Sequence, residues 1–213
     1  MANLHIGRGD ALLVVDVQND FLPGGALGVR DGDAVIAPLN AYIARCRSLG
    51  VPVYATRDWH PPDHCSFEAR GGPWPTHCVA GTRGAEFAPA LELPPDVPVV
   101  SKATESGRDA YSAFDGTGLD EHLRRDGVRR ILVGGLATDY CVRWTVEDAL
   151  AKGYEAVVLR DAVRAVDVQP GDGARALRAI RRRGAATVGA APGGRHVTRV
   201  RRGSARSRAR SAG

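Results

Sequence analysis

The chain has 213 residues and a formal net charge of +5, with 44% hydrophobic and 25% charged residues. This composition is typical of one full-sized globular domain, and it excludes a collagen-like or wholly disordered chain. No apolar run approaches the ~20 residues that cross a membrane. The segment MANLHIGRGD has no long apolar stretch, so we expect no secretory signal. We therefore expect a cytoplasmic protein that has no membrane partner.

The positive charge is concentrated at the C-terminus. Residues 189–213 contain seven arginines and no acidic residue, so residues 1–188 carry 22 basic and 24 acidic side chains. This tail of Arg, Ser, Ala and Gly has little apolar surface to bury, which predicts disorder. We expect a folded domain over residues 1–188 and an Arg-rich tail over residues 189–213. Only the tail is suited to binding nucleic acid.

Short apolar runs alternate with longer amphipathic segments. Runs that predict strands are Ala11–Val15, Val51–Ala55, Val97–Val100, Ile131–Val133, Ala156–Leu159 and Ala185–Val188. Helical periodicity covers Asp33–Leu49, Leu119–Arg125, Asp139–Lys152 and Asp172–Arg183. Pro38 lies inside the first of these, so that helix is either kinked or begins later. Strands that are apolar on both faces and alternate with helices predict a three-layer α/β/α sandwich around a mainly parallel sheet.

Polar side chains follow four of the predicted strands. Asp16 follows the first strand, Asp58 and His60 the second, Lys102 the third, and Cys141 the fourth. Ligands of open α/β sheets bind at the carboxyl ends of the strands. If these strands are parallel neighbours, the five side chains meet at one edge of the sheet.

Cys141 opens a predicted helix, and a helix N-terminus stabilises both a thiolate and an oxyanion. The alternative is a buried structural cysteine. Asp16 and Lys102 each follow an apolar strand, so each needs a partner, and the two form either a base–cation pair beside the thiol or a structural ion pair. The four cysteines of a chain without a signal point to thiols or metal ligands more than to disulfides.

The segment from Arg57 to Pro95 lacks periodicity and is rich in Pro, Gly, His and Trp. Asp58 and His60 stand two apart, so in an extended segment they point the same way and offer oxygen and nitrogen ligands to Zn, Fe or Mn. His64 and His77 follow in the same loop, each directly before a cysteine. A closed structural zinc site is therefore the alternative to an open metal centre.

Four motifs carry a resemblance to a known family. They are ALLVVDVQNDFLPGGALGV around Asp16, TRDWHPPDH with WPTHCVAGT in the loop, SKATESGRDAYSAF around Lys102, and GGLATDYCVRWTVEDA around Cys141. With these motifs the chain resembles the isochorismatase-like cysteine hydrolases, and within them the nicotinamidase (pyrazinamidase) group. The resemblance implies a Rossmann-like fold with a six-stranded, mainly parallel sheet.

The resemblance also implies roles for individual residues. A catalytic triad would consist of Asp16, Lys102 and Cys141. One divalent metal ion, zinc ahead of iron or manganese, would be held by Asp58, His60 and His77, with His64 or waters completing its shell. An oxyanion hole would use the backbone N–H groups of Ala137 and Cys141, next to a cis peptide between Leu136 and Ala137. The substrate pocket would be lined by Phe21, Leu27, Trp74 and Tyr111.

The activity that this resemblance implies is hydrolysis of nicotinamide, and of pyrazinamide, to the acid and ammonia through a cysteine thioester, as part of NAD salvage. The partner would be this small molecule, and the resemblance leaves room for a homo-oligomer. One alternative is another amidohydrolase of the family that acts on an N-carbamoyl or ureido compound. A second is a non-catalytic binding protein, which the complete triad disfavours.

Overall fold

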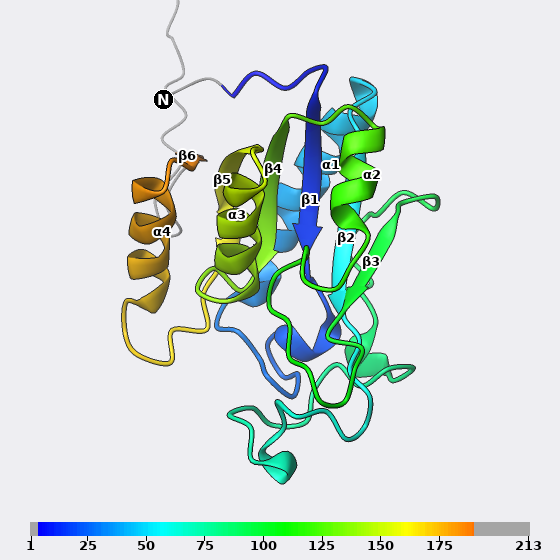
Figure 1. The fold of residues 1–213 in the computed structure, drawn as a ribbon, viewed down its shortest axis with the longest axis vertical. Helices are drawn as coiled ribbons and strands as arrows, with labels where there is room; N and C mark the ends of the chain where they lie inside the picture. The colour runs from blue at the N-terminus through cyan, green and yellow to red at the C-terminus, as the bar shows by residue number, and fades with distance from the viewer. Residues whose placement is uncertain (1–3, 190–213) are drawn as a thin grey trace, which may run out of the picture.

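The computed structural model describes residues 4–189, so all but the first residue of the predicted Arg-rich tail lies outside the described residues. A sheet of six strands runs through the molecule in the order β3-β2-β1-β4-β5-β6 (Figure 1). Every neighbouring pair of strands is parallel. The strands span Asp10–Val15 (β1), Val53–Asp58 (β2), Val99–Lys102 (β3), Arg130–Leu136 (β4), Glu155–Arg164 (β5) and Ala186–Val188 (β6).

Helices cover both faces of this sheet, which confirms the three-layer sandwich. Helix α1 (Ile36–Ser48) lies behind the sheet in Figure 1, and its side chains pack on one core cluster. Helices α2 (Leu119–Arg125), α3 (Cys141–Ala151) and α4 (Asp172–Arg182) contribute to the second cluster on the other face. Alternate residues of β1 belong to the two core clusters, because successive side chains of a strand point to opposite faces of the sheet. The apolar residues of β1, Ala11–Val15, are therefore buried along the whole run, and Asp10 at its start is buried as well.

Several boundaries differ from those that periodicity predicts. Helix α1 begins at Ile36, so Pro38 lies in its first turn, where the missing N–H costs no helical hydrogen bond. A 3-10 turn over Gly32–Val35 precedes it. Strands β2 and β3 begin about two residues later than predicted and run on through polar residues to Asp58 and Lys102. Asp58 and Lys102 are buried and form an ion pair with each other. Apolar periodicity alone does not reveal this pairing, so it places the strand ends too early.

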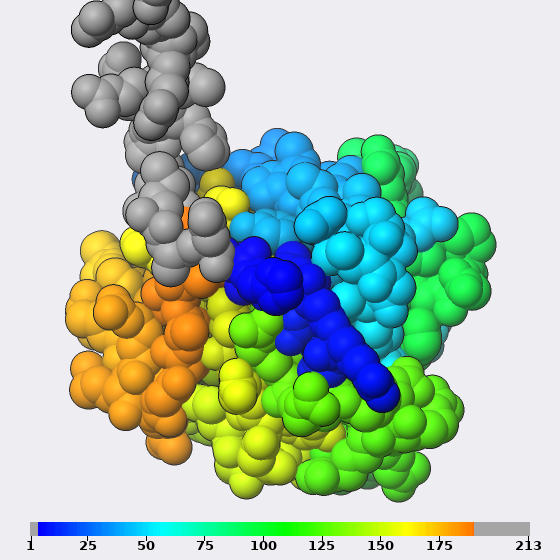
Figure 2. Space-filling view, turned by 90° about the horizontal axis from the view of Figure 1, so that it is seen from above, coloured from blue at the N-terminus to red at the C-terminus, as the bar shows by residue number. Residues whose placement is uncertain are grey.

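The parallel order brings the carboxyl ends of β1, β2, β3 and β4 to one end of the molecule. The long segment after β2 lies there and contains only the short 3-10 turns Glu68–Arg70 and Arg83–Ala85. The described N-terminal residues cross the opposite end, seen from above in Figure 2. Within residues 4–189, no helix is long and apolar enough to cross a membrane.

Candidate active site

Lys102 is the centre of the polar cluster at this edge of the sheet. Its buried Nζ lies 3.0 Å from Asp16 Oδ2 and 3.3 Å from Cys141 Sγ, and it also contacts Asp58 Oδ1. The register of the sheet explains the last contact, since Asp58 pairs directly with Lys102. The predicted pairing of Asp16 with Lys102 is confirmed, and Asp58 is a second carboxylate partner that the sequence did not indicate.

The charges of this cluster depend on one another. Burial disfavours the Lys102 ammonium, but Asp16 and Asp58 more than offset it and raise the pKa of Lys102 well above its usual range. Burial likewise opposes ionisation of Asp58, yet the Lys102 ammonium and His60 lower the pKa of that carboxyl far below its ordinary value. The resting site therefore holds a charged lysine and an ionised Asp58.

Asp16 has the properties of a proton acceptor. Burial raises the pKa of Asp16 although Lys102 acts in the opposite direction. Thr56 Oγ1 donates a hydrogen bond of 2.6 Å to its Oδ1. Its buried Oδ2 lies 3.0 Å from Lys102 Nζ and has no further partner among the described residues. That oxygen is therefore the atom of Asp16 that can take up a proton from the thiol.

Cys141 is the first residue of α3, as predicted, and its thiol is buried. Burial raises the pKa of the Cys141 thiol well above its usual range, with Lys102 opposing and Asp16 and Asp58 adding to the rise. This direction is opposite to the one expected from the helix N-terminus, because burial, the largest of these causes, disfavours the charged thiolate. A carboxylate oxygen of Asp16 and Cys141 Sγ lie within 4.8 Å of each other, so a base stands beside this protonated thiol.

Ala137 and Cys141 are the residues whose backbone N–H groups the resemblance assigns to an oxyanion hole. The peptide between Leu136 and Ala137 is cis, as the resemblance implied. Within residues 4–189, the N–H groups of Ala137 and Cys141 donate no hydrogen bond to a protein acceptor. Both residues line the pocket, Ala137 directly after β4 and Cys141 at the start of α3, so their N–H groups are candidates to bind a ligand oxygen.

Asp58, His60 and His77 form a cluster suited to a metal ion. One ligand atom from each lies within 4.8 Å of the others, and all three residues are buried. The Nδ1 atoms of His60 and His77 face the carbonyl oxygens of Ala103 and Pro75, at 3.2 and 2.7 Å. Such contacts leave each Nε2 as a lone-pair donor, and His60 Nε2 is buried without a hydrogen-bond partner in the described chain. An oxygen and two imidazole nitrogens fit zinc, iron or manganese.

His64 and the cysteines of the loop do not join this cluster. Both ring nitrogens of His64 are engaged, Nδ1 with Ser66 Oγ at 2.7 Å and Nε2 with the Arg108 carbonyl at 3.0 Å. All four cysteines are free thiols, as predicted. In the described part of the chain, neither cysteine of the loop belongs to a metal-ligand group, so the closed structural zinc alternative is not supported.

Gln18 holds Asp58 in place and was missed in the sequence, although it stands in the first motif. Its side chain is fully buried. Gln18 Oε1 accepts a hydrogen bond of 2.8 Å from the Asp58 N–H, while Nε2 donates to the carbonyl oxygens of Asp58 and Ala85 at 2.7 and 2.9 Å. Gln18 thus fixes the end of β2, where the metal cluster begins.

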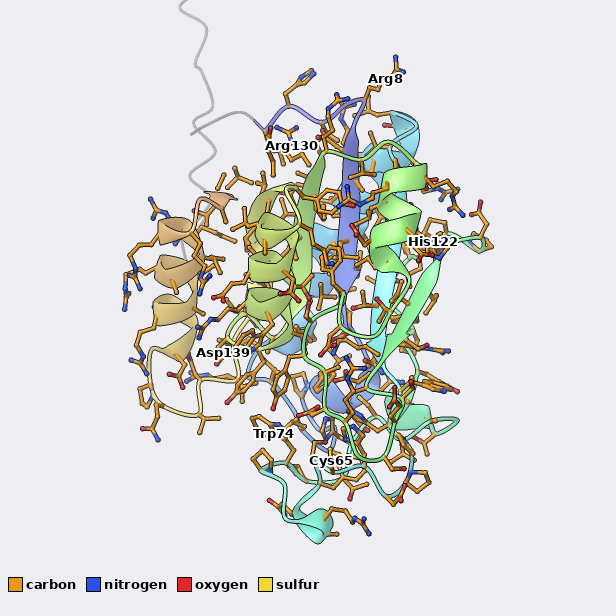
Figure 3. The ribbon with its side chains drawn as sticks, viewed as in Figure 1. Arg8, Cys65, Trp74, His122, Arg130 and Asp139 are labelled. Atoms are coloured by element: carbon orange, nitrogen blue, oxygen red, sulfur yellow. The ribbon has the colours of Figure 1, made fainter. Side chains whose placement is uncertain are left out.

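An aromatic pocket opens beside these groups. All four predicted wall residues line it, together with others that include Ser66, Asp109, Tyr140 and Val166. Trp74, labelled in Figure 3 at the end of the sheet, donates its indole N–H to the Tyr111 hydroxyl at 3.0 Å. Its ring meets Tyr140 edge-on, with centroids 4.9 Å apart. Two of the missed residues had a positional signal: Tyr140 precedes the cysteine, and Asp109 stands two residues before Tyr111.

Comparison with known proteins agrees with this architecture. The isochorismatase domain family matches residues 10–192. The nicotinamidase of Escherichia coli is 41% identical over 188 residues, covering 78% of this chain and 88% of its own length. A pyrazinamidase of Pyrococcus horikoshii solved in complex with zinc is 50% identical, with a TM-score of 0.81, and covers 84% of this chain and 98% of its own.

A relative with a different substrate is also similar. N-carbamoylsarcosine amidase of Thermoplasma acidophilum is 32% identical, with a TM-score of 0.70, covering 84% of this chain and 94% of its own. The fold is thus shared by amidases of more than one specificity. The match over most of the described residues shows that the chain belongs to the isochorismatase family.

Proposed function

We propose that the protein is a nicotinamidase that hydrolyses nicotinamide, and also pyrazinamide, to the acid and ammonia in NAD salvage. The observation that carries this proposal is the Lys102 ammonium, which touches Asp16, Asp58 and Cys141 and so joins a nucleophile, a base and a metal cluster under one aromatic pocket. The nicotinamidase and pyrazinamidase named among the relatives support the substrate class.

The pocket walls are suited to a flat neutral ring. The apolar and aromatic surface of the pocket is supplied by Phe21, Leu27, Trp74 and Tyr111. The hydrogen bond from Trp74 to Tyr111 fixes the positions of these two side chains relative to each other. Aromatic walls bind aromatic ligands through offset and edge contacts. A zinc ion held by Asp58, His60 and His77 would bind the ring nitrogen and orient the carboxamide toward the sulfur.

The proposed reaction begins with a proton transfer. Asp16 Oδ2 takes the thiol proton of Cys141, while the nearby Lys102 ammonium stabilises the thiolate as it forms. The sulfur attacks the carboxamide carbon, and the N–H groups of Ala137 and Cys141 bind the oxygen as it gains charge. Asp16 then gives its proton to the departing ammonia, which leaves a thioester on Cys141. Asp16 accepts a proton from water as the water attacks the thioester. The C–S bond then breaks, the proton passes from Asp16 back to the Cys141 sulfur, and the acid is released.

The alternative substrate class is an N-carbamoyl or ureido acid, as the name of the Thermoplasma relative suggests for that protein. An amino-acid substrate of that kind carries a carboxylate, which a binding site ordinarily meets with Arg or Lys. Among the described residues that line this pocket there is no Arg or Lys. Lys102 lies beneath the pocket and is already paired with two carboxylates. This lining favours the neutral amide.

The decisive test measures ammonia release from nicotinamide by the purified protein. We expect turnover that stops with a chelator and returns when Zn, Fe or Mn is added. The Cys141→Ala variant should retain metal but lose turnover and thioester formation, a loss of several orders of magnitude. Cys46, a buried cysteine in the core behind the sheet, provides the matched control, and Cys46→Ala should stay active if it folds.

Three results would contradict the proposal. Deamidation by Cys141→Ala would show that this sulfur is not the nucleophile. Turnover of an N-carbamoyl amino acid with none of nicotinamide or pyrazinamide would assign the site to the alternative class. If the metal-loaded protein hydrolysed neither kind of amide, it would be a binding protein instead.

A further inference from the structure

One carboxylate in the pocket has no part in the proposed reaction. Asp109 lines the pocket and is half-buried, on the segment that follows β3. Its Oδ1 accepts a hydrogen bond of 2.9 Å from the N–H of Ala110. The carbonyl of that same residue lies 3.3 Å from Lys102 Nζ, so this segment is held close to the reacting groups.

Asp109 acts on the aromatic wall of the pocket. It stands two residues before Tyr111, and both residues line the cavity. Burial, and secondarily the charge of Asp109, raise the pKa of the Tyr111 hydroxyl to about 12, while the hydrogen bond from Trp74 opposes the rise. Asp109 is therefore close enough for its charge to act on this wall of the pocket.

Asp58 and Asp109 both line the pocket, but among the described residues only Asp58 has a cationic partner. Asp58 is compensated by the Lys102 ammonium and is a candidate metal ligand. In residues 4–189, Asp109 forms no ion pair, and no Arg or Lys lines the pocket. Its negative charge is therefore directed at whatever occupies the cavity, in surroundings where partial burial weakens screening by salt.

This charge distinguishes between substrate and product. If the proposed function holds, on which this inference rests, the pocket receives a neutral amide and must discharge a carboxylate of nearly the same shape. We propose that Asp109 is a specificity-determining residue that repels carboxylates, both the acid formed in the reaction and ureido acids that approach as substrates. Its repulsion of the product favours release of the acid and limits inhibition by it.

A purely structural role would give a different result. Asp109→Asn keeps an oxygen that can accept the hydrogen bond from Ala110 and removes only the charge. Asp109→Glu keeps the charge on a longer side chain. A loop that merely needs its hydrogen bond would tolerate Asn better than Glu, whereas a repelling charge requires Glu in preference to Asn.

The test compares the binding of nicotinamide and nicotinate by calorimetry at neutral pH. It uses the zinc-loaded full chain in the non-turning-over Cys141→Ala background. We expect Asp109→Asn to tighten nicotinate binding roughly tenfold while nicotinamide binding changes less than about twofold, as for the loss of one nearby charge. Asp109→Glu should keep the original ratio. Glu121→Gln, the same charge change on the exposed surface of α2, should also leave it unaltered.

The binding measurements test the inference about Asp109 separately from the proposed function. Equal changes for both ligands in Asp109→Asn, or none, would overturn the inference and leave the proposed function standing if the unmodified protein deamidates nicotinamide. Failure of the Cys141→Ala protein to bind either ligand would overturn both. The same ratio should appear in turnover, where nicotinate inhibits Asp109→Asn at about a tenth of the concentration that inhibits the parent enzyme.

Discussion

Single residues at or just after the carboxyl ends of β1, β2 and β3 determine whether the reacting groups meet. Lys102 is fully buried between Asp16 and Asp58, and removing one partner of a buried ion pair commonly costs about 3–5 kcal/mol because the other charge is left unpaired. Asp58 in turn depends on Gln18, which holds both its N–H and its carbonyl. The position of Asp58 in the cluster therefore depends partly on the uncharged side chain of Gln18.

We predict that Gln18→Leu weakens metal binding by about 10–100-fold, the usual effect of losing a group that orients a metal ligand. The reason is that Leu cannot hold the Asp58 backbone, so the carboxylate is no longer aimed at the two histidines. Competition with a chelator measures the affinity, and circular dichroism checks the fold. Gln169→Leu, at an exposed position, is the matched control. Unchanged metal affinity in folded Gln18→Leu would remove Gln18 from the site.

The sequence predicted the residues whose polar character interrupts an apolar pattern. Asp16 stands out because it directly follows an uninterrupted apolar run, and Cys141 because it opens the helix after a later apolar strand. Gln18 and Asp109 could not be recognised in this way. Both lie in irregular segments rich in polar residues. The role of Gln18 depends on Asp58, which is 40 residues away in the sequence. The role of Asp109 depends on a pocket whose lining comes from several distant segments of the chain.

At the scale of elements, the sheet brings chain segments together at defined registers. Val15 pairs with Thr56 of β2 and with Gly135 of β4. Gly135 has a φ of +125°, and a Cβ there would lie 2.0 Å from the Val15 carbonyl oxygen. Only glycine permits this approach directly below the active site. The close contact of β1 and β4 is what brings Asp16 and Cys141 within reach of each other.

A prediction at this scale concerns the docking of α2 on the sheet. Tyr54, a buried residue of β2, donates a hydrogen bond to the Asp126 carboxylate at the end of α2. This bond is the main reason why the pKa of Asp126 lies below its usual value of 3.8. A lowered pKa stabilises the fold above the unfolded-state value, and this contribution disappears as the pH falls through the folded-state value.

Tyr54→Phe should therefore lower the free energy of unfolding by about 1 kcal/mol at pH 7, allowing for the partial exposure of Asp126. The difference from the parent should shrink below about pH 4, as Asp126 becomes protonated. Urea denaturation at several pH values measures it. Tyr42→Phe is the control, since its hydroxyl lies 3.4 Å from both Asp161 oxygens and makes a weaker contact. A deficit of the same size at pH 3 and pH 7 would contradict the assignment.

At the scale of the whole molecule, a bound metal would connect the long loop to the sheet. His77 lies in the loop, whereas Asp58 is the last residue of β2. Metal at about 1,000 times its Kd stabilises a folded protein by about 4 kcal/mol. For a domain of this size, removal of the metal should lower the Tm by on the order of 10 °C.

Thermal unfolding with and without chelator tests this prediction. His77→Ala should abolish the response to metal, and His5→Ala, an exposed histidine at the opposite end, should retain it. An equal response of His77→Ala and the parent protein would place the metal elsewhere.

The Arg-rich tail provides a second prediction at this scale. Removing residues 193–213 takes away all seven of its arginines and spares the region that matches the family. Amidase activity should be unchanged, while any salt-sensitive retention of DNA or RNA should be lost. Ammonia release and nucleic-acid retention at two salt concentrations measure the two effects. Loss of activity would show that the catalytic domain extends into the tail.

The sequence by itself determined the layers of the fold, the parallel sheet and the residues of the cluster, because apolar periodicity and polar interruptions are local properties of the chain. The tertiary structure alone decided that Lys102 contacts Asp58 as well as Asp16, that both nitrogens of His64 are engaged, and that burial keeps the Cys141 thiol protonated. Each of these depends on distances across the sheet and on exclusion of water, which arise only when distant segments pack together.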